Sequence, residues 1–461
     1  MGSTCAVILA AGEGKRMKSD CSKVLSKVLF KPMINWVAEV VVQSGTKDIC
    51  IVTGHTGELV REHMGEGFSY AVQNERLGTG HAVMQATEFI KQSGAENVLI
   101  LNGDAPLIDE ITIEESLNQH IATDSAVTVV SAYMENPMGY GRILRNHKCD
   151  IAKIVEQRDA TEDEKKIHEV NSGVYWFRSK ELLYALSQLK PENDQGEYYL
   201  TDAVETVKRI GERASAFITD NSSVILGAND RLQLMELNEI ARQEKLHALM
   251  FSGVDIPCTD GVIICDGVTV GKGTTILPNT ILRGKTTVGE YCELGPNCLI
   301  DDSQIKDNVK LVNVQIENSV VENGADAGPY AHIRPNSHIG ENVHIGNFVE
   351  VKNSVLGSGT KLPHLTYVGD SDIGKCVNFG CGSLTVNYDG KNKTRTTVND
   401  NAFIGCNTNL IAPVTVGTYS YIAAGATITE DVPEYSLSIA RAKQTNKEGW
   451  VKQKKPFKNM D

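Results

Sequence analysis

Residues 262–300 read VIICDGVTVGKGTTILPNTILRGKTTVGEYCELGPNCLI, and this stretch decides the fold of the second half of the chain. An apolar residue recurs at every sixth position, at Ile264, Val270, Ile276, Leu282, Val288, Leu294 and Ile300. Glycine often follows it, and a small residue often stands four positions after it. A six-residue period of this kind is the signature of a parallel β-helix, in which each unit is one short strand and a turn.

The same period returns at residues 333–351 and again at residues 398–428. Three units make one triangular coil, and the apolar residue of each unit points into the prism. Stacked coils then pair as parallel strands about 4.8 Å apart. Because no coil buries its apolar face alone, the array has to be long. The polar stretch TVNYDGKNKTRTT at residues 385–397 interrupts the period, and loops that break a solenoid are often functional.

The first half of the chain has a different pattern. Strand-like runs at residues 6–9, 49–52, 98–101 and 126–130 alternate with helix-like segments at residues 34–43, 80–92 and 113–123. This alternation predicts βαβ units on a mostly parallel sheet, whose ligands bind where the strands end. Residues 230–250 contain no glycine or proline, which favours a connecting helix. We therefore expect domains at residues 1–229 and 253–461, joined by a helical linker at residues 230–252.

Length and composition narrow the functional classes. The chain has 461 residues, which exceeds the roughly 250–300 residues at which single cores stop growing. Its net charge of −13 argues against a nucleic-acid-binding protein. No apolar run reaches the roughly 18 residues of a membrane span, and the start of the chain lacks the basic region of a signal peptide. The 11 scattered cysteines favour reduced thiols. We expect a cytoplasmic protein without nucleic-acid partners or stable membrane insertion.

A glycine-containing turn follows the first strand-like run, in the stretch AAGEGKRM at residues 10–17. Such a turn lets backbone N–H groups approach phosphate oxygens, and Arg16 and Lys23 lie close enough in sequence to neutralise them. Met17 replaces the third glycine of the dinucleotide fingerprint, and no Gly-Lys-Ser/Thr follows, so the pattern is not a P-loop either. Asp104 ends another strand-like run, where a carboxylate can hold Mg²⁺ against phosphates. Each signal alone is more often a simple turn.

Together the motifs resemble a known family. The stretches LAAGEGKRM (residues 9–17), LGTGHA (77–82), GDAPL (103–107), GYGRI (139–143) and NSG (171–173) are similar to those of sugar-nucleotide pyrophosphorylases. HLTYVGD (364–370) and NYDG (387–390) extend the resemblance to the bifunctional N-acetylglucosamine-1-phosphate uridylyltransferase/glucosamine-1-phosphate N-acetyltransferase family, over nearly the whole chain. The resemblance implies a Rossmann-like α/β nucleotidyltransferase domain, then a left-handed parallel β-helix acetyltransferase domain with a basic C-terminal tail.

The resemblance implies that the first domain uses Mg²⁺ and transfers a uridylyl group from UTP to N-acetylglucosamine-1-phosphate. The matching positions are Leu9, Ala10, Ala11, Gly12, Lys23, Gln73, Gly78 and Thr79 for the nucleotide, Gly141, Glu156 and Asn171 for the sugar, and Asp104 and Asn229 for the metal. Lys23 and Arg16 are the expected catalytic cations at the leaving pyrophosphate. The attacking phosphate is already anionic, so no strong general base is expected. Asn102 stands where the family commonly has tyrosine.

For the second domain, the resemblance implies acetylation of glucosamine-1-phosphate by acetyl-CoA, with His364 as general base oriented by Glu350. The positions matching sugar-phosphate contacts are Arg334, Lys352, Tyr367, Asn378, Asn387 and Tyr388, and those matching acetyl-CoA contacts are Cys381, Cys406, Ala424 and Arg441. Cys381 and Cys406 replace the family's alanine and serine, so thiol reagents are expected to block the site. A lone histidine on a repeat is otherwise usually solvated. His332, His338 and His344 recur every six residues, a spacing expected to stack them on related faces of the prism. We expect these three side chains to be solvated as well.

A single prism has no deep pocket, so sugar and CoA would need a groove between neighbouring prisms. The resemblance implies a homotrimer with each acetyltransferase site between subunits, and we expect the loop at residues 385–397 to reach a neighbouring chain. Two alternatives remain at this point. The chain can be a pyrophosphorylase of one activity whose β-helix regulates or oligomerises it, or a non-catalytic scaffold. The joint presence of His364, Asn387-Tyr388 and Arg441 favours two activities, and Asp104 with Lys23 argues against a scaffold.

Overall fold

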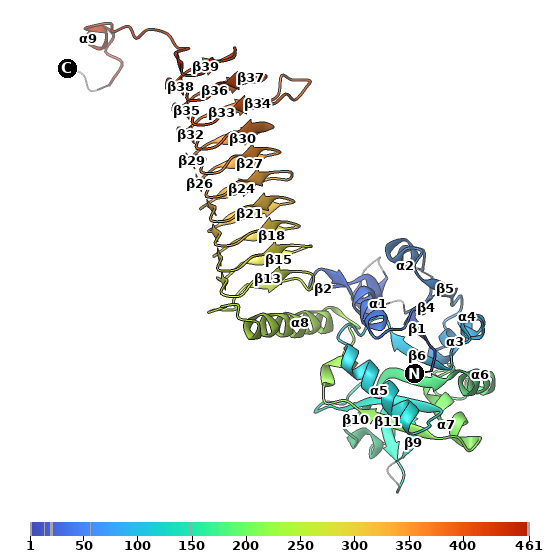
Figure 1. Ribbon diagram of the computed structural model, residues 1–461. Helices are drawn as coiled ribbons and strands as arrows, with labels where there is room; N and C mark the ends of the chain where they lie inside the picture. Colours follow the sequence, from blue (N-terminus) through green and yellow to red (C-terminus); the bar gives the residue numbers. More distant parts are fainter. Residues whose placement is uncertain (1, 13, 19–21, 56, 148–149, 459–461) are drawn as a thin grey trace. The chain divides into compact units, whose positions relative to one another are not determined.

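The computed structural model describes residues 2–12, 14–18, 22–55, 57–147 and 150–458. The chain divides into two compact units, Met1–Glu244 and Lys245–Asp461. Helix α8 (Arg231–Phe251) occupies the segment expected to be a connecting helix, and the boundary between the units lies within it (Figure 1). Among the described residues, no helix is both long enough and apolar enough to cross a membrane.

The first unit is built on one mixed sheet. Its main strands are β1 (Thr4–Ala10), β4 (Asp48–Thr53), β5 (Ser69–Val72), β6 (Asn97–Asn102), β7 (Val127–Tyr133), β10 (Glu169–Arg178) and β11 (Ala214–Ile218), with β8 (Arg142–Arg145) and β9 (Ile151–Val155) attached to β10. The order across the sheet is β11-β7-β10-β6-β1-β4-β5. Only β10 runs antiparallel to its two neighbours in this order, so the expected mostly parallel sheet is confirmed.

Helices cover both faces of this sheet. They are α1 (Met33–Gln43), α2 (Gly57–Met64), α3 (Thr79–Gln85), α4 (Thr87–Ser93), α5 (Glu110–Ala122), α6 (Ser179–Gln188) and α7 (Thr201–Arg209). Alternate residues of β1 join different cores, because strand side chains alternate between faces. Val7 packs in a cluster with residues of α3, α6 and α7, whereas Ile8 packs in a cluster with residues of α1 and α5. The segment expected as one helix at residues 80–92 is two helices, because α3 ends at Gln85 and α4 begins at Thr87, with Ala86 between them.

The parallel strands β1, β4 and β6 end at the same edge of the sheet. That edge receives the glycine turn after Ala10, the residues after Thr53 and the Asn102–Asp104 segment. Backbone contacts hold these turns together, since Gly103 N donates to Leu9 O at 2.8 Å. The topology therefore brings the first group of expected site residues to one edge.

The second unit is a left-handed parallel β-helix with three faces (Figure 1). The first face runs from β12 (Ile263–Ile264) to β39 (Thr427–Ile428) and includes β24 (Ala331–Ile333), β27 (Glu350–Lys352) and β30 (Tyr367–Gly369). The second runs from β13 (Thr269–Val270) to β37 (Val414–Val416) and includes β25 (His338–Ile339) and β34 (Thr396–Val398). The third runs from β14 (Thr275–Ile276) to β40 (Leu437–Ser438) and includes β26 (His344–Asn347), β29 (Lys361–His364), β32 (Asn378–Phe379), β35 (Phe403–Ile404) and β38 (Tyr421–Ile422).

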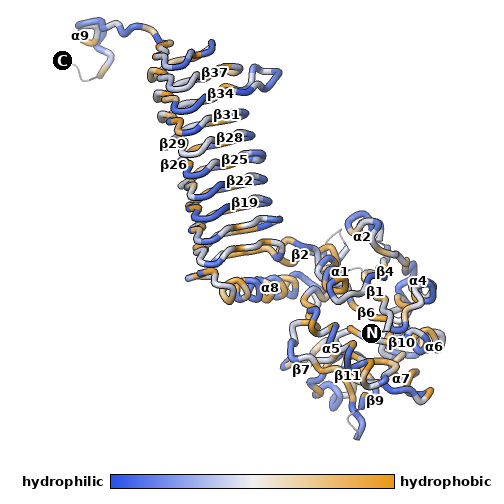
Figure 2. Tube along the Cα trace, in the orientation of Figure 1, coloured by the Kyte–Doolittle hydropathy of each residue, from blue (hydrophilic) through white to orange (hydrophobic). Residues whose placement is uncertain are grey.

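The apolar repeat residues form one continuous core inside the prism, and Figure 2 shows hydrophobic positions recurring from coil to coil. Most coils have nearly the same number of residues; for example, Val270 pairs with Val288, eighteen residues later in the chain. One coil is longer, because Ile373 pairs with Val398 and the polar stretch lies between them. The interruption is therefore an excursion from one corner, and the strands on both sides of it keep their pairing.

The histidines spaced six residues apart do not stack on one face. His332 lies on the first face, His338 on the second and His344 on the third, because a step of six residues moves the chain to the next face. His338 pairs with Glu322 at 3.3 Å and His344 with Asp326 at 2.7 Å. The described residues contain no group of three side chains that can hold a metal ion.

We call the turns that join third-face strands to first-face strands the site corner. Residues there have positive φ, a conformation that suits asparagine and glycine and occurs at Asn297 and Asn313. Three successive coils instead place Tyr330, Phe348 and Leu365 there, at φ of 61°, 59° and 46°. Their side chains are 54–61% exposed, and the rings of Tyr330 and Phe348 stack at 5.5 Å. The site corner thus carries an exposed apolar ladder.

Candidate functional site

A cavity of about 250 Å³ lies at the edge of the first sheet where β1 and β6 end. Its lining includes eight of the expected nucleotide and metal residues: Leu9, Ala11, Gly12, Lys23, Gln73, Gly78, Thr79 and Asp104. Ala10 is buried within β1 and does not line the cavity. Asn102, the departure from the family pattern, lines it as well.

Lys23 is the electrostatic centre of this cavity. Its ammonium group forms an ion pair with Asp104 and donates to Asn229 Oδ1 at 2.8 Å. The Lys23 side chain is only 10% exposed, and that of Asp104 is 24% exposed. The carboxylate and the amide oxygen that were expected to hold a metal therefore converge on one positive charge.

Two glycines let the backbone approach closely here. Gly14 has φ of +61°, and a Cβ atom at this position would stand 2.7 Å from Lys23 Cβ. Gly78 has φ of +102°, and a Cβ atom there would stand 2.5 Å from Tyr198 O. A side chain at either position would displace the lysine or the Gly78–Thr79 turn.

The base-reading residue expected at position 73 is held by its amide nitrogen. Gln73 Nε2 donates to Gly78 O at 3.0 Å and to His81 Nδ1 at 3.1 Å. Thr79 Oγ1 accepts from Leu200 N at 3.1 Å, which fixes the same turn from the other side. The carbonyl oxygen of Gln73 is thus the end of the amide that is available to a ligand.

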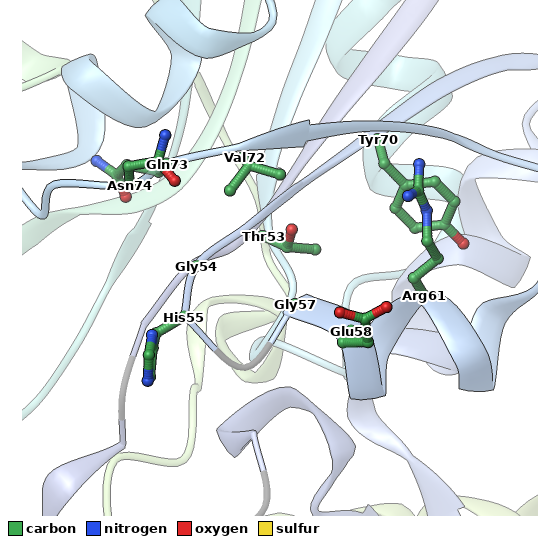
Figure 3. A pocket seen from close by; sticks show the side chains of 10 residues that line it. All are labelled: Thr53, Gly54, His55, Gly57, Glu58, Arg61, Tyr70, Val72, Gln73 and Asn74. Carbon is green, nitrogen blue, oxygen red and sulfur yellow. The ribbon is translucent and has the colours of Figure 1, made fainter.

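A second hollow of about 280 Å³ borders this cavity and shares Gln73 with it (Figure 3). It lies beyond the ends of β4 and β5, and the Arg61 guanidinium stands over the Tyr70 ring at 4.9 Å. Figure 3 shows Glu58 beside Arg61 on α2, with His55 on the opposite side of the hollow. Apart from Gln73, its lining holds no residue that the sequence predicted.

Of the expected sugar residues, Glu156 lines a larger cavity of about 470 Å³, which Arg16, Tyr140 and Asn229 also line, whereas Gly141 and Asn171 are not part of its lining. Asn171 N donates to Gly141 O at 2.9 Å, and the Glu156 carboxylate would stand 3.5 Å from a Cβ atom at Gly141. The Asn171 side chain donates to the Tyr175 hydroxyl at 2.6 Å, next to a register shift in β10. Gly141, Glu156 and Asn171 are therefore neighbours in space.

Glu156 lies in this wall without a cationic partner among the described ion pairs. Burial raises the pKa of Glu156, and the hydrogen bond from Thr201 opposes that shift only in part. Arg142 lies in the GYGRI motif and was not among the predicted site residues. It is almost fully buried, and it donates to Gln157 Oε1 at 2.8 Å and to Tyr140 O. It thereby supports two residues of the sugar cavity.

In the second unit, the expected base and acetyl-CoA residues form one column along the site corner. Asn347 pairs with His364, and the pairing of β29 with β32, of β32 with β35 and of β35 with β38 continues the register to Cys381, Cys406 and Ala424. His364 is exposed, and its Nδ1 lies 3.4 Å from Asn347 Oδ1. Arg441 donates to Ala424 O at 2.8 Å at the far end of the column.

Charged residues line the first face beside this column. Arg334 donates to Glu350 Oε1 at 2.8 Å, so within one chain the carboxylate expected to orient His364 is paired with Arg334. Tyr367 lies directly above Glu350 in the next coil. Arg334 and Lys352 were expected from the sequence, but the contact of Arg334 with Glu350 was not.

The polar excursion is a short hairpin that projects from the prism and is tied to it at its base (Figure 1). Tyr388 and Lys393 pair across it, and Arg395 anchors it to Asp372 at 2.5 Å. The Lys393 ammonium group, which sequence analysis did not single out, lowers the pKa of Lys352. Two amino groups thus meet where first-face strands turn into second-face strands, an arrangement suited to an anion.

Asp370 fixes the base of the excursion. Burial opposes its ionisation, but the side-chain amides of Asn353 and Asn387 donate to it and hold the pKa of Asp370 below its usual range. The expected sugar residue Asn387 is therefore oriented by a carboxylate. Asn378 lies on β32, at a half-buried position of the third face, and Tyr388 is 56% exposed.

Known proteins match both units. Residues 5–235 match the nucleotidyl transferase family, and residues 267–302, 318–353 and 395–430 match the bacterial transferase hexapeptide family. The chain is 50% identical over 448 residues to the bifunctional protein GlmU of Thermoanaerobacter pseudethanolicus, with 97% of each chain covered. It is 49% identical over 454 residues to that of Caldanaerobacter subterraneus subsp. tengcongensis, covering 98% of this chain and 99% of the relative.

The chain belongs to the GlmU family. A third relative, the bifunctional protein GlmU of Acetivibrio thermocellus, is 48% identical over 446 residues, with 97% of this chain and 96% of the relative covered. Membership of the GlmU family confirms the expected bifunctional enzyme, a uridylyltransferase and an acetyltransferase that make UDP-N-acetylglucosamine in two steps. Because these relatives match along both units, the single-activity and scaffold alternatives are disfavoured.

Proposed function

We propose that the second unit acetylates glucosamine-1-phosphate with acetyl-CoA, and that the first unit then transfers uridylyl from UTP to the N-acetylglucosamine-1-phosphate. One observation carries this proposal: residues distant in sequence converge on two clusters of different chemistry. The cluster in the first unit consists of Lys23, Asp104 and Asn229. The cluster in the second unit consists of His364 and the small side chains that follow it in register along the site corner.

In the first unit, the convergence of Asp104 and Asn229 on the Lys23 ammonium supports a cation site made of two protein oxygens. Two oxygens fit Mg²⁺, which keeps several waters and substrate oxygens among its ligands. Asp104 and Asn229 would hold Mg²⁺, which would neutralise negative charge on the nucleotide phosphates.

Lys23 then contacts phosphate oxygens instead of its resting partners, and Arg16 approaches them from the sugar cavity. The sugar-phosphate oxygen attacks the α-phosphorus of UTP in line, and pyrophosphate leaves. Gln73 reads the uracil through its free carbonyl oxygen, and Glu156 and Asn171 hold sugar hydroxyls. Positioning and fixed charge lower the barrier, since the attacking group is already an anion.

In the second unit, His364 accepts the proton of the glucosamine amino group as its nitrogen attacks the thioester carbonyl, and the CoA thiolate leaves. From His364 to Ala424 the column climbs three coils, about 14 Å. An extended acyl-pantetheine arm lying along it would bring its thioester to His364, with Arg441 near its other end. Lys352 and Lys393 would bind the sugar phosphate, and Tyr367, Asn378 and Asn387 the sugar.

We further propose that the active form is a homotrimer in which the site corner of one chain faces a second copy. The apolar ladder of Tyr330, Phe348 and Leu365 supports this, because it keeps bulky side chains exposed in a strained backbone conformation directly beside His364. A column on a single convex corner also leaves one side of the acyl arm open.

Two assays test the proposal. Acetyl-CoA and glucosamine-1-phosphate should release free CoA thiol, and N-acetylglucosamine-1-phosphate with UTP and Mg²⁺ should release pyrophosphate. Absence of thiol release would remove the second activity, and absence of pyrophosphate would remove the first. Tyr330→Ser combined with Phe348→Ser should shift the mass measured by light scattering toward the monomer and lower thiol release while sparing pyrophosphate release.

A further inference from the structure

We propose that Cys381 and Cys406 are a thiol pair that forms a reversible disulfide and thereby closes the site corner to acetyl-CoA. The inference rests on the proposed acetyltransferase function of this corner. It concerns a pair of cysteines in adjacent coils, in register, and both on the column that leads to His364.

The register places the two thiols one above the other. Phe379 pairs with Ile404 before the turn, and Leu384 pairs with Asn409 after it. Both pairs have the same separation along the chain as Cys381 and Cys406, and Asn407 N donates to Cys381 O at 2.8 Å. Adjacent coils stand about 4.8 Å apart. Disulfides join Cα atoms roughly 4.4–6.8 Å apart, so the bond needs side-chain rotation and little backbone movement.

Exposure separates these two thiols from the buried cysteines among the described residues. Cys406 is exposed, Cys381 is partly exposed, and both are free. In contrast, burial raises the pKa of Cys50 to about 12, and burial also raises the pKa values of Cys5, Cys265, Cys292 and Cys298. The thiolate is the reactive form, so the buried cysteines are slow to react. A groove that admits acetyl-CoA also admits a small oxidant to Cys381 and Cys406.

The chemistry needs an oxidant, which we take to be a small-molecule disulfide. The thiolate of Cys406, the more exposed residue, attacks one sulfur of that disulfide and releases the first small thiolate. The Cys381 thiolate then attacks the Cys406 sulfur of the mixed disulfide and releases the second. Two electrons pass from the protein to the oxidant, and the two departing thiolates take up the two protons. A dithiol reductant reverses both steps.

Closure changes the surface along which the acyl arm is proposed to lie. The bond brings the two sulfur atoms to about 2.05 Å from each other, so both side chains turn toward one another along the column. The column between His364 and Ala424 is then bridged at its middle. The same bond would also tie together the two ends of the coil that carries the Asn387–Lys393 excursion. The first unit contains neither cysteine, so uridylyl transfer is expected to continue.

The experiment treats the full-length enzyme with glutathione disulfide and follows thiol-independent readouts of both reactions. Acetyl transfer is measured as N-acetylglucosamine-1-phosphate by mass spectrometry, and uridylyl transfer as pyrophosphate. We expect a Cys381–Cys406 cross-linked peptide, a fall in acetyl transfer of at least tenfold, unchanged uridylyl transfer, and recovery with dithiothreitol. Prior incubation with acetyl-CoA should slow the cross-link.

Single variants distinguish a disulfide between Cys381 and Cys406 from modification of one thiol alone. Cys381→Ala and Cys406→Ser should each lose the cross-link, and the ratio of oxidised to reduced activity should rise toward one in both. Cys376→Ser is the matched control, because Cys376 is an exposed thiol on another corner, and this variant should respond to oxidation like the unaltered enzyme.

Each outcome bears on one proposal. If the fully reduced enzyme makes no N-acetylglucosamine-1-phosphate, the proposed acetyltransferase site itself is wrong. If the reduced enzyme is active but no cross-link forms, or the cross-linked enzyme keeps its activity, the thiol pair has no such role. Inhibition that persists in both single variants would likewise assign the effect to other groups and overturn the inference.

Discussion

Replacement of Lys23 by methionine isolates the charge at the centre of the nucleotide cavity. The variant keeps most of the apolar stem but removes the ammonium group that pairs with Asp104 and Asn229. Removal of one hydrogen-bond donor aimed at developing negative charge costs about 2.7–4 kcal/mol, or a 10²–10³-fold fall in kcat. Because Lys23 already makes two contacts in the free protein, we expect the lower end, about a hundredfold.

The assay is pyrophosphate release at saturating UTP and Mg²⁺, with N-acetylglucosamine-1-phosphate as acceptor. The Asp104 side chain is 24% exposed, so water can solvate it in part after the change, and the free energy of unfolding should fall by about 1–3 kcal/mol. Lys27→Met is the control, because Lys27 is exposed on the same segment. A loss below tenfold in Lys23→Met, or an equal loss of acetyl transfer, would refute the reasoning.

Glu156→Gln should lower uridylyl transfer but raise the melting temperature near neutral pH. The pKa of Glu156 is raised in the folded protein, so its ionisation lowers folding stability once the pH exceeds the pKa that Glu156 has in the unfolded chain. Melting curves should show that the stability advantage of the glutamine variant shrinks below pH 4. His364→Ala should abolish acetyl transfer while pyrophosphate release continues, and loss of both would show that the two sites are not separate. Lys393→Ala should raise the KM for glucosamine-1-phosphate at least tenfold with little change in the KM for acetyl-CoA, whereas Lys391→Ala, an exposed neighbour, should leave both values unchanged. Chelation of Mg²⁺ should stop pyrophosphate release and spare thiol release.

The sequence predicted the architecture well, because each half follows a simple period. A six-residue repeat allows few structures other than a coil of three strands, and apolar residues such as Val270 and Val288 lie where that period puts them. The four expected strands of the first unit correspond to β1, β4, β6 and β7. The stacking expected for His332, His338 and His344 was wrong, since the same period distributes them over three faces.

Details of the sites depended on partners that no local pattern reveals. Lys393 meets Lys352 because Asp370 and Asp372 hold the excursion through Asn387 and Arg395, contacts between positions distant in sequence. Glu350 pairs with Arg334 across adjacent coils, which requires the register of the stack rather than its period. Arg142 was visible in a motif, but its burial beneath Tyr140 and Gln157 needed the fold.

The long coil between Ile373 and Val398 has a consequence for how such proteins diversify. Its extra residues leave from a corner, while the strands on either side remain bonded to the coils above and below. The length and composition of a segment inserted in this way can change without altering how the strands of the β-helix pair. If the excursion binds the acceptor as proposed, exchange of this one segment would change acceptor preference while His364 and the stacked coils stay the same.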